Sequence, residues 1–130
     1  MESKIENYTS YLNVLIDDKK NEITTLTQEQ RFDEANHAKI QLNVLEIFEK
    51  MFTIGYQKAK PLLQSDEEKA LEVLSSTYLN YFDKIPHNWL INLEKSIQYH
   101  DIETEHIEKL KISQANTIKN YFIEIMKKEA

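Results

Sequence analysis

DEANHAKIQLNVLEIFEKMFTIGYQKAK, residues 33–60, is the stretch of the chain that decides the fold. Its apolar residues recur at three- and four-residue steps, as in an α-helix, but along two separate stripes. The first stripe comprises Ala35, Ala38, Leu42, Leu45, Phe52, Tyr56 and Ala59, and the second comprises Ile40, Val44, Ile47, Met51 and Ile54, with Phe48 between them. A helix with one buried face needs an apolar arc of about 100°, which this helix exceeds. It therefore packs on two sides: it is central within the chain, or its second face meets another copy of the protein.

The end of this helix depends on Gly55 and Pro61. Glycine inside a helix costs about 1 kcal/mol relative to alanine. Gly55 either ends the helix as a left-handed cap, or continues it and forms with Ala59 a small-residue pair that another helix can approach closely. Both alternatives are open, and continuation is the one we favour. Proline disfavours helical conformation at the residue before it, so we expect the helix to end at Lys60.

Apolar stripes at helical spacing predict three further helical arms, over residues 3–26, 66–99 and 102–128. In the third arm, Trp89, Leu93 and Ile97 continue the stripe beyond Pro86, so we expect that proline to kink or split the arm near residues 83–87. Short connections favour antiparallel neighbours. The predicted fold is all-α: a single domain over residues 1–130, forming an antiparallel up-down-up-down four-helix bundle whose third arm is broken or kinked near Pro86.

The composition excludes several classes of function. With one glycine and two prolines, the chain has little material for the tight turns of a β-fold. A net charge of −6 and a single arginine, Arg31, argue against binding nucleic acid, which needs clustered basic residues, and against adhering to an anionic membrane. The absence of cysteine fits a reducing compartment. The N-terminus lacks a signal-peptide pattern, so we expect a cytoplasmic protein.

EANH runs from Glu34 to His37, and the same spacing returns in ETEH, from Glu103 to His106. Residues three apart share a helix face, so each glutamate lies beside its histidine. Paired Glu-x-x-His motifs hold two metal ions in some four-helix bundles. In an up-down-up-down bundle the second and fourth helices begin at the same end. These four residues are therefore candidate ligands for iron, manganese or zinc.

A simpler interpretation of the same residues is the one we favour. Both motifs lie in the first turn of their helices, where Glu34 and Glu103 complement the positive end of the helix dipole. The other two helices would have to supply further carboxylates, for which the sequence offers Glu22 and either Asp83 or Asp101. None of these lies in a shielded helix middle. We therefore expect helix-start acids, surface histidines and no cofactor.

No motif marks an enzyme. The chain has no cysteine nucleophile and no serine in a Gly-x-Ser-x-Gly setting. It lacks the glycines of a phosphate-binding loop. Tyr78, Tyr81 and Trp89 could line a small-ligand pocket near the break in the third arm, but aromatic residues at helical spacing usually face the core, and we favour core packing.

LNVL occurs at residues 12–15 and 42–45, and LEVL follows at 71–74. The spacing of about thirty residues raises the possibility of a helical repeat array. The segments that flank the three phrases share little. Leu-x-Val-Leu is also common on buried helices, so we interpret the phrases as independent core patterning.

QRFDEANHAKIQL, residues 30–42, resembles the turn and second helix of the short helical hairpin in nucleotide-excision-repair subunits. The resemblance implies a hairpin that binds a copy of itself. It covers a tenth of the chain, the preceding NEITTLTQ departs from the motif, and no repair function is carried over. As a whole, the chain resembles small uncharacterised helical-bundle proteins of Gram-positive bacteria with AT-rich genomes, a likeness that carries no site residues.

Together these features predict a non-enzymatic helical bundle that acts through protein–protein interaction. We expect it to self-associate as a homodimer through its second helix, because that helix has two apolar faces. The alternative is a metal-binding bundle that uses Glu34, His37, Glu103 and His106.

Overall fold

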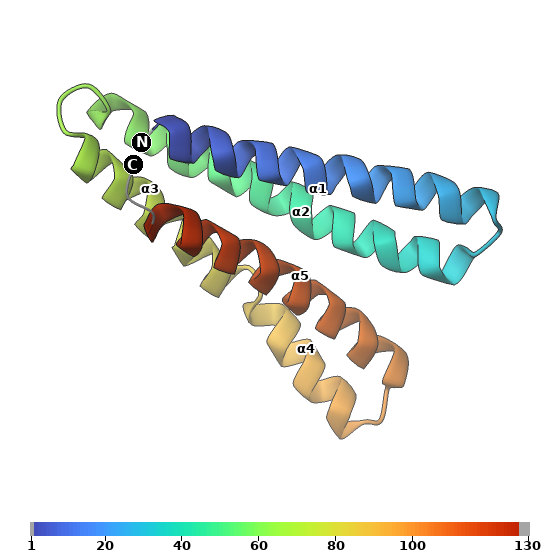
Figure 1. Ribbon diagram of the computed structural model, residues 1–130. Coiled ribbons are helices and arrows are strands. Elements are labelled where there is room, and N and C mark those ends of the chain that lie inside the picture. The colour runs from blue at the N-terminus through green and yellow to red at the C-terminus, as the bar shows by residue number, and fades with distance from the viewer. Residues whose placement is uncertain (1, 128–130) are drawn as a thin grey trace.

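The computed structural model describes residues 2–127 and is all-α, as predicted (Figure 1). Its elements are α1 (Glu2–Gln28), α2 (Phe32–Ala59), the 3-10 turn η1 (Lys60–Leu62), α3 (Glu67–Lys84), α4 (His87–Gln98) and α5 (Ile102–Lys127). No strand occurs within these residues. The predicted end of the last helix, Lys128, lies outside them. None of the described helices is long and apolar enough to cross a membrane.

The double apolar face of α2 is covered within the chain. α2 packs against α1, α3 and α5. Val44 on the second stripe is fully buried, and Ile40, Ile47 and Met51 are partly buried, whereas Ile54 at the end of that stripe is 36 % exposed. The first of the two alternatives therefore accounts for both stripes except at Ile54, and the double apolar face by itself gives no reason to expect another copy of the protein on α2.

The helix α2 continues through Gly55, and no residue near its end has a positive φ angle. Gly55 is buried against α3, where an added Cβ would lie 3.2 Å from Leu74 Cδ1. The favoured alternative is thus confirmed: the glycine is a site of close helix approach and not a cap. α2 ends at Ala59, one residue before the predicted end, and η1 follows directly.

α3 ends at Lys84 and α4 begins at His87, with the buried Pro86 between them. The N–H of Ile85 still donates to the carbonyl of Tyr81 at 2.9 Å. Proline has no N–H with which to extend this ladder, so the hydrogen bonding of α3 stops there.

The chain is built from two helical hairpins that match at an offset of 70 residues. α1 ends at Gln28 and α2 begins at Phe32, and correspondingly α4 ends at Gln98 and α5 begins at Ile102. We call residues 70 positions apart twin positions. The first hairpin is α1–α2, and the second is α3–α4 with α5 (Figure 1).

The turns of the two hairpins have the same geometry at twin positions. Gln30 and His100 have positive φ angles of 60° and 56°, the only such values among the described non-glycine residues. In each turn the next N–H bonds back five residues, from Arg31 to Leu26 O and from Asp101 to Ser96 O. The turn chemistry differs, because the Asp101 carboxylate accepts from the N–H and the hydroxyl of Thr104, which lowers its pKa.

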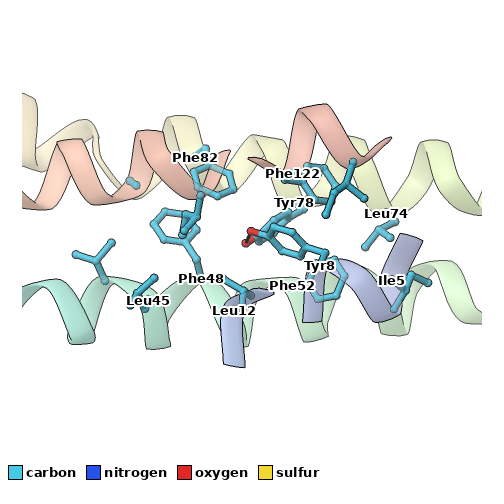
Figure 2. Packing of buried hydrophobic residues seen from close by; sticks show 14 of the residues in the cluster. Ile5, Tyr8, Leu12, Leu45, Phe48, Phe52, Leu74, Tyr78, Phe82 and Phe122 are labelled. Carbon is cyan, nitrogen blue, oxygen red and sulfur yellow. Dashed lines mark hydrogen bonds between the residues drawn. The ribbon is translucent and has the colours of Figure 1, made fainter. Parts of the chain in front are cut away.

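At the centre of the core, aromatic side chains at twin positions pair in the same way. Tyr8 and Tyr78, at twin positions, join their hydroxyls at 2.6 Å (Figure 2). The ring centroids of Tyr8 and Phe122 are 5.1 Å apart, and those of the matching pair, Tyr78 and Phe52, are 5.2 Å apart. The other matching pairs, Tyr8–Phe52 and Tyr78–Phe122, are separated by 5.0 Å and 4.8 Å. The same four rings thus pack in the same way from either hairpin.

Burial controls the chemistry of the two central hydroxyls. Tyr8 and Tyr78 are both 0 % exposed. Loss of solvation raises the pKa of each phenol far above its ordinary value, and for Tyr78 the neighbouring phenol adds to the rise. Each hydroxyl is the other's hydrogen-bond partner, so both protons stay in place and neither group is orphaned.

Candidate functional site

The structure brings the two predicted histidines together. His37 on α2 and His106 on α5 meet edge to face, with ring centroids 4.7 Å apart. His37 is half-buried and His106 is exposed. The two helices therefore approach each other at their starts, where the Glu-x-x-His motifs lie.

The predicted carboxylates do not join the histidines in a metal-binding group. Glu34 is exposed and forms a bidentate pair with Arg31, in which Nε lies 3.2 Å from Oε1. Glu103 is also exposed. Glu22 pairs with Lys19 at 2.9 Å. Within residues 2–127, no three or more acidic or histidine side chains gather in an arrangement that could hold a metal ion.

Tyr78 lies in the filled core rather than in the wall of a ligand pocket. Its ring contacts Phe48, Phe52, Phe82 and Phe122 at centroid distances from 4.8 Å to 6.4 Å. Core packing is thus confirmed for Tyr78, whereas Tyr81 and Trp89 are partly buried and pack against the edge of the core.

The feature that sequence reasoning missed is an exposed apolar surface on α4 and the turn that follows it. We call it the tip surface. It comprises Leu90 (48 % exposed), Ile91 (37 %), Ile97 (50 %), Tyr99 (73 %) and Ile102 (78 %). Ile97 was predicted to continue the buried stripe, and this is wrong, because Ser96 takes the buried position and turns Ile97 outward.

The first hairpin is an internal control for the tip surface. Its residues at the twin positions of Leu90, Ile91, Ile97 and Tyr99 are polar: Lys20, Asn21, Thr27 and Glu29. Only Ile102 has an apolar twin, Phe32, which is also exposed. A hairpin with this turn therefore forms without apolar residues at four of the five positions, so the fold does not require them. Comparing the halves of the sequence at an offset of 70 would have revealed this difference.

In comparisons with known proteins, the chain matches no protein-family model, no curated protein and no solved structure. The case for function therefore rests on the tip surface and the histidine pair.

Proposed function

We propose that this chain is a non-enzymatic helical bundle that acts through protein–protein interaction, and that it associates with a second copy of itself through the tip surface. The observation that carries the proposal is the exposure of five large apolar side chains within thirteen residues. Exposed large apolar side chains that gather in one part of a protein commonly mark interaction sites. The polar twin positions of the first hairpin support a role other than folding.

The charge around the tip surface suits a second copy as the partner. The chain carries a net charge of −6, yet residues 87–102 contain only Glu94, Lys95 and Asp101 as charged side chains. Two such segments can approach each other with little like-charge repulsion, and each offers the other an apolar face. A basic partner would find few carboxylates here.

The exposed area predicts a weak dimer. Covering a half-exposed Leu, Ile or Tyr side chain contributes on the order of 1 kcal/mol. Five such side chains on each of two copies contribute roughly 10 kcal/mol, which is comparable with the ~4–15 kcal/mol cost of association. The net gain is then at most about 6 kcal/mol, so we expect a dissociation constant of tens of micromolar or weaker, on the order of 0.1–1 mM.

The proposal also includes the arrangement of the helices and the location of the protein. The chain is a single domain, an antiparallel up-down-up-down bundle whose third arm bends at Pro86, and it works in the cytoplasm. Other helices of the same chain pack against both faces of its second helix. The tip surface therefore replaces the second helix as the proposed dimer contact.

The first experiment grafts the outer residues of the first hairpin onto the second. The variant L90K/I91N/I97T/Y99E carries residues that the protein already accommodates at the twin positions. Sedimentation velocity of the wild type from about 10 µM to 1 mM should show a rising average mass, and the graft should stay monomeric. Helical circular dichroism of both proteins should match.

The control makes a similar number of changes at exposed positions of the first hairpin. The variant N13K/D17N/N21K/T24K leaves the tip surface intact, so it should self-associate like the wild type. A wild type that remains monomeric at 1 mM would exclude the proposal. If the grafted variant self-associates as strongly as the wild type, the contact between copies lies outside the tip surface.

The second candidate function, a metal site, rests on one observation. His37 and His106 stand 4.7 Å apart on different helices. A ring rotation would let two imidazole nitrogens bind one borderline ion such as Zn²⁺, with water in the remaining positions. Glu34 and Glu103 lie one turn earlier on the same helices and would have to swing inward, which costs Glu34 its pair with Arg31.

Calorimetric titration with Zn²⁺ tests this candidate on protein made without a histidine tag. The wild type should bind one equivalent, and H37A and H106A should each lose it. H87Q, which changes an exposed histidine at the start of α4, should bind like the wild type. Equal binding by all four proteins would show that the pair is not the site.

A further inference from the structure

The helix α4 is attached to the rest of the protein differently from its twin segment in the first hairpin. Residues 17–28 are the second half of the continuous helix α1. α4 is instead separated from α3 by residues 85 and 86. Among the described residues, α5 is the one helix against which α4 packs over more than a few residues. The contact with α5 is therefore what keeps α4 packed against the rest of the protein.

At the tip of the second hairpin, polar residues occupy the positions at which the first hairpin has apolar ones. The inner face of the first hairpin at its tip is a small cluster of Leu26, Ala35 and Ala38, with Ile23 beside it. The twin positions of the three buried residues are Ser96, Glu105 and Glu108. Ser96 and Glu108 are 4 % and 5 % exposed, and they are the two buried polar side chains among the described residues.

Neither buried polar group binds across the contact between α4 and α5. The Ser96 hydroxyl donates to the carbonyl of Leu93 in its own helix, at 2.7 Å. Glu108 Oε1 accepts from Lys111, also in its own helix, at 3.2 Å. Its second oxygen, Oε2, is buried and has no hydrogen-bond partner within residues 2–127.

An orphaned carboxylate oxygen makes closure of α4 costly. Water would solvate Oε2 whenever α4 moves away, whereas closure removes that solvation and gives no bond in return. Closure is favoured by the partial burial of Trp89 and Leu93 and by the Lys111 ammonium, which lies 5.9 Å from the centre of the Trp89 ring. This distance is at the outer limit of a cation–π contact, and the ammonium is shared with Glu108.

We propose that α4 is a releasable helix, which opens from α5 about residues 85 and 86 while the rest of the bundle stays folded. Release hydrates Glu108 and exposes Trp89 and Leu93, the partly buried apolar residues of the inner face of α4. Local openings of this kind occur where an element has few buried apolar contacts. α4 fits that condition, because Ser96 is its one buried residue. The proposal stands without the self-association proposed above.

Hydrogen exchange read by mass spectrometry tests the release at a concentration where the protein is monomeric. Amides of residues 90–98 should exchange faster than those of residues 20–28, which precede a turn of the same backbone geometry. The variant E108A installs the residue of the twin position, Ala38. Removing the orphaned charge should slow exchange of residues 90–98 by roughly tenfold or more. Exchange of residues 20–28 should stay unchanged, which separates a local effect from a general gain in stability.

Trp89 gives a second readout, because it is the only tryptophan and lies in α4. Acrylamide should quench its fluorescence less in E108A than in the wild type. The reverse variant, A38E, should speed exchange of residues 20–28 if the first hairpin tolerates it. Equal exchange of the two segments in the wild type would overturn the proposal. So would an E108A variant in which exchange of residues 90–98 and quenching of Trp89 are both unchanged.

Discussion

Removing one hydroxyl from the central tyrosine pair should lower the free energy of unfolding by more than half of the amount by which removing both hydroxyls lowers it. Tyr8 and Tyr78 are fully buried, and each hydroxyl has the other as its partner, at 2.6 Å. In Y8F the hydroxyl of Tyr78 stays in the core without a partner, and Y78F leaves the hydroxyl of Tyr8 in the same position. An orphaned buried hydroxyl costs about 1–3 kcal/mol.

The double variant Y8F/Y78F leaves no orphaned group. Replacing both partners by apolar groups of similar shape is often close to neutral, so we expect the double variant to cost less than about 1 kcal/mol. The two single costs should agree within about 0.5 kcal/mol, because the same rings surround the two positions. The cost of the double variant should then be smaller than the sum of the two single costs by at least about 1 kcal/mol.

Urea unfolding followed by circular dichroism measures these four free energies. Y81F serves as the control, because Tyr81 is only partly buried and should lose less than about 0.5 kcal/mol. If the costs of Y8F and Y78F simply add in the double variant, the two hydroxyls do not act as a hydrogen-bonded pair.

Three further predictions concern the core. Burial raises the pKa of Tyr8 and of Tyr78 above the ordinary value of about 10, so their contribution to stability is complete below pH 10 and declines as the pH rises above it. The free energy of unfolding should fall by up to about 2.7 kcal/mol per pH unit in alkaline urea titrations, and the slope should flatten in Y8F/Y78F. G55V must fit a branched side chain where a Cβ alone would lie 3.2 Å from Leu74 Cδ1. Urea unfolding should therefore show a loss of about 1–3 kcal/mol in the free energy of unfolding. The control T53V, at an exposed position of the same helix, should change this free energy little. F48A removes a fully buried ring stacked on Phe82 at 4.1 Å, and it should lower the free energy of unfolding by about 3–5 kcal/mol; a loss below 1 kcal/mol would contradict the packing.

The sequence was sufficient to predict α2, because its apolar pattern is long and dense. Two stripes over one helix required two packed sides, and the chain supplies both with α1, α3 and α5. The pattern could not say which of two partners covers the second face, another part of the chain or another copy. That choice depends on how the helices meet in space.

The relation between the two hairpins was harder to predict. The phrases LNVL and LEVL suggested a period of about thirty residues, whereas the structure repeats at 70. Few identities survive between the halves, and the most informative are Tyr8 with Tyr78 and Tyr11 with Tyr81.

The candidate sites were predicted with mixed success for a physical reason. Spacing correctly placed His37 and His106 at one end of the molecule, because helix starts and connection lengths set that level. The spacing of the motif could not show that Glu34 would form an ion pair with Arg31. Arg31 directly follows Gln30, whose positive φ angle shapes the turn before α2. The exposure of Ile97 was missed because the helical stripe alone does not distinguish it from its neighbour Ser96.

The central claim, that two copies meet through the tip surface, is tested most directly by labels placed at twin positions. The chain has no cysteine, so Q98C and Q28C each accept a single nitroxide, at the end of α4 and at the end of α1. Dipolar spectroscopy near 1 mM should detect close label pairs between copies for Q98C and none for Q28C, and mixing with unlabelled protein should abolish the signal. Close pairs at both positions, or at position 28 alone, would contradict the claim.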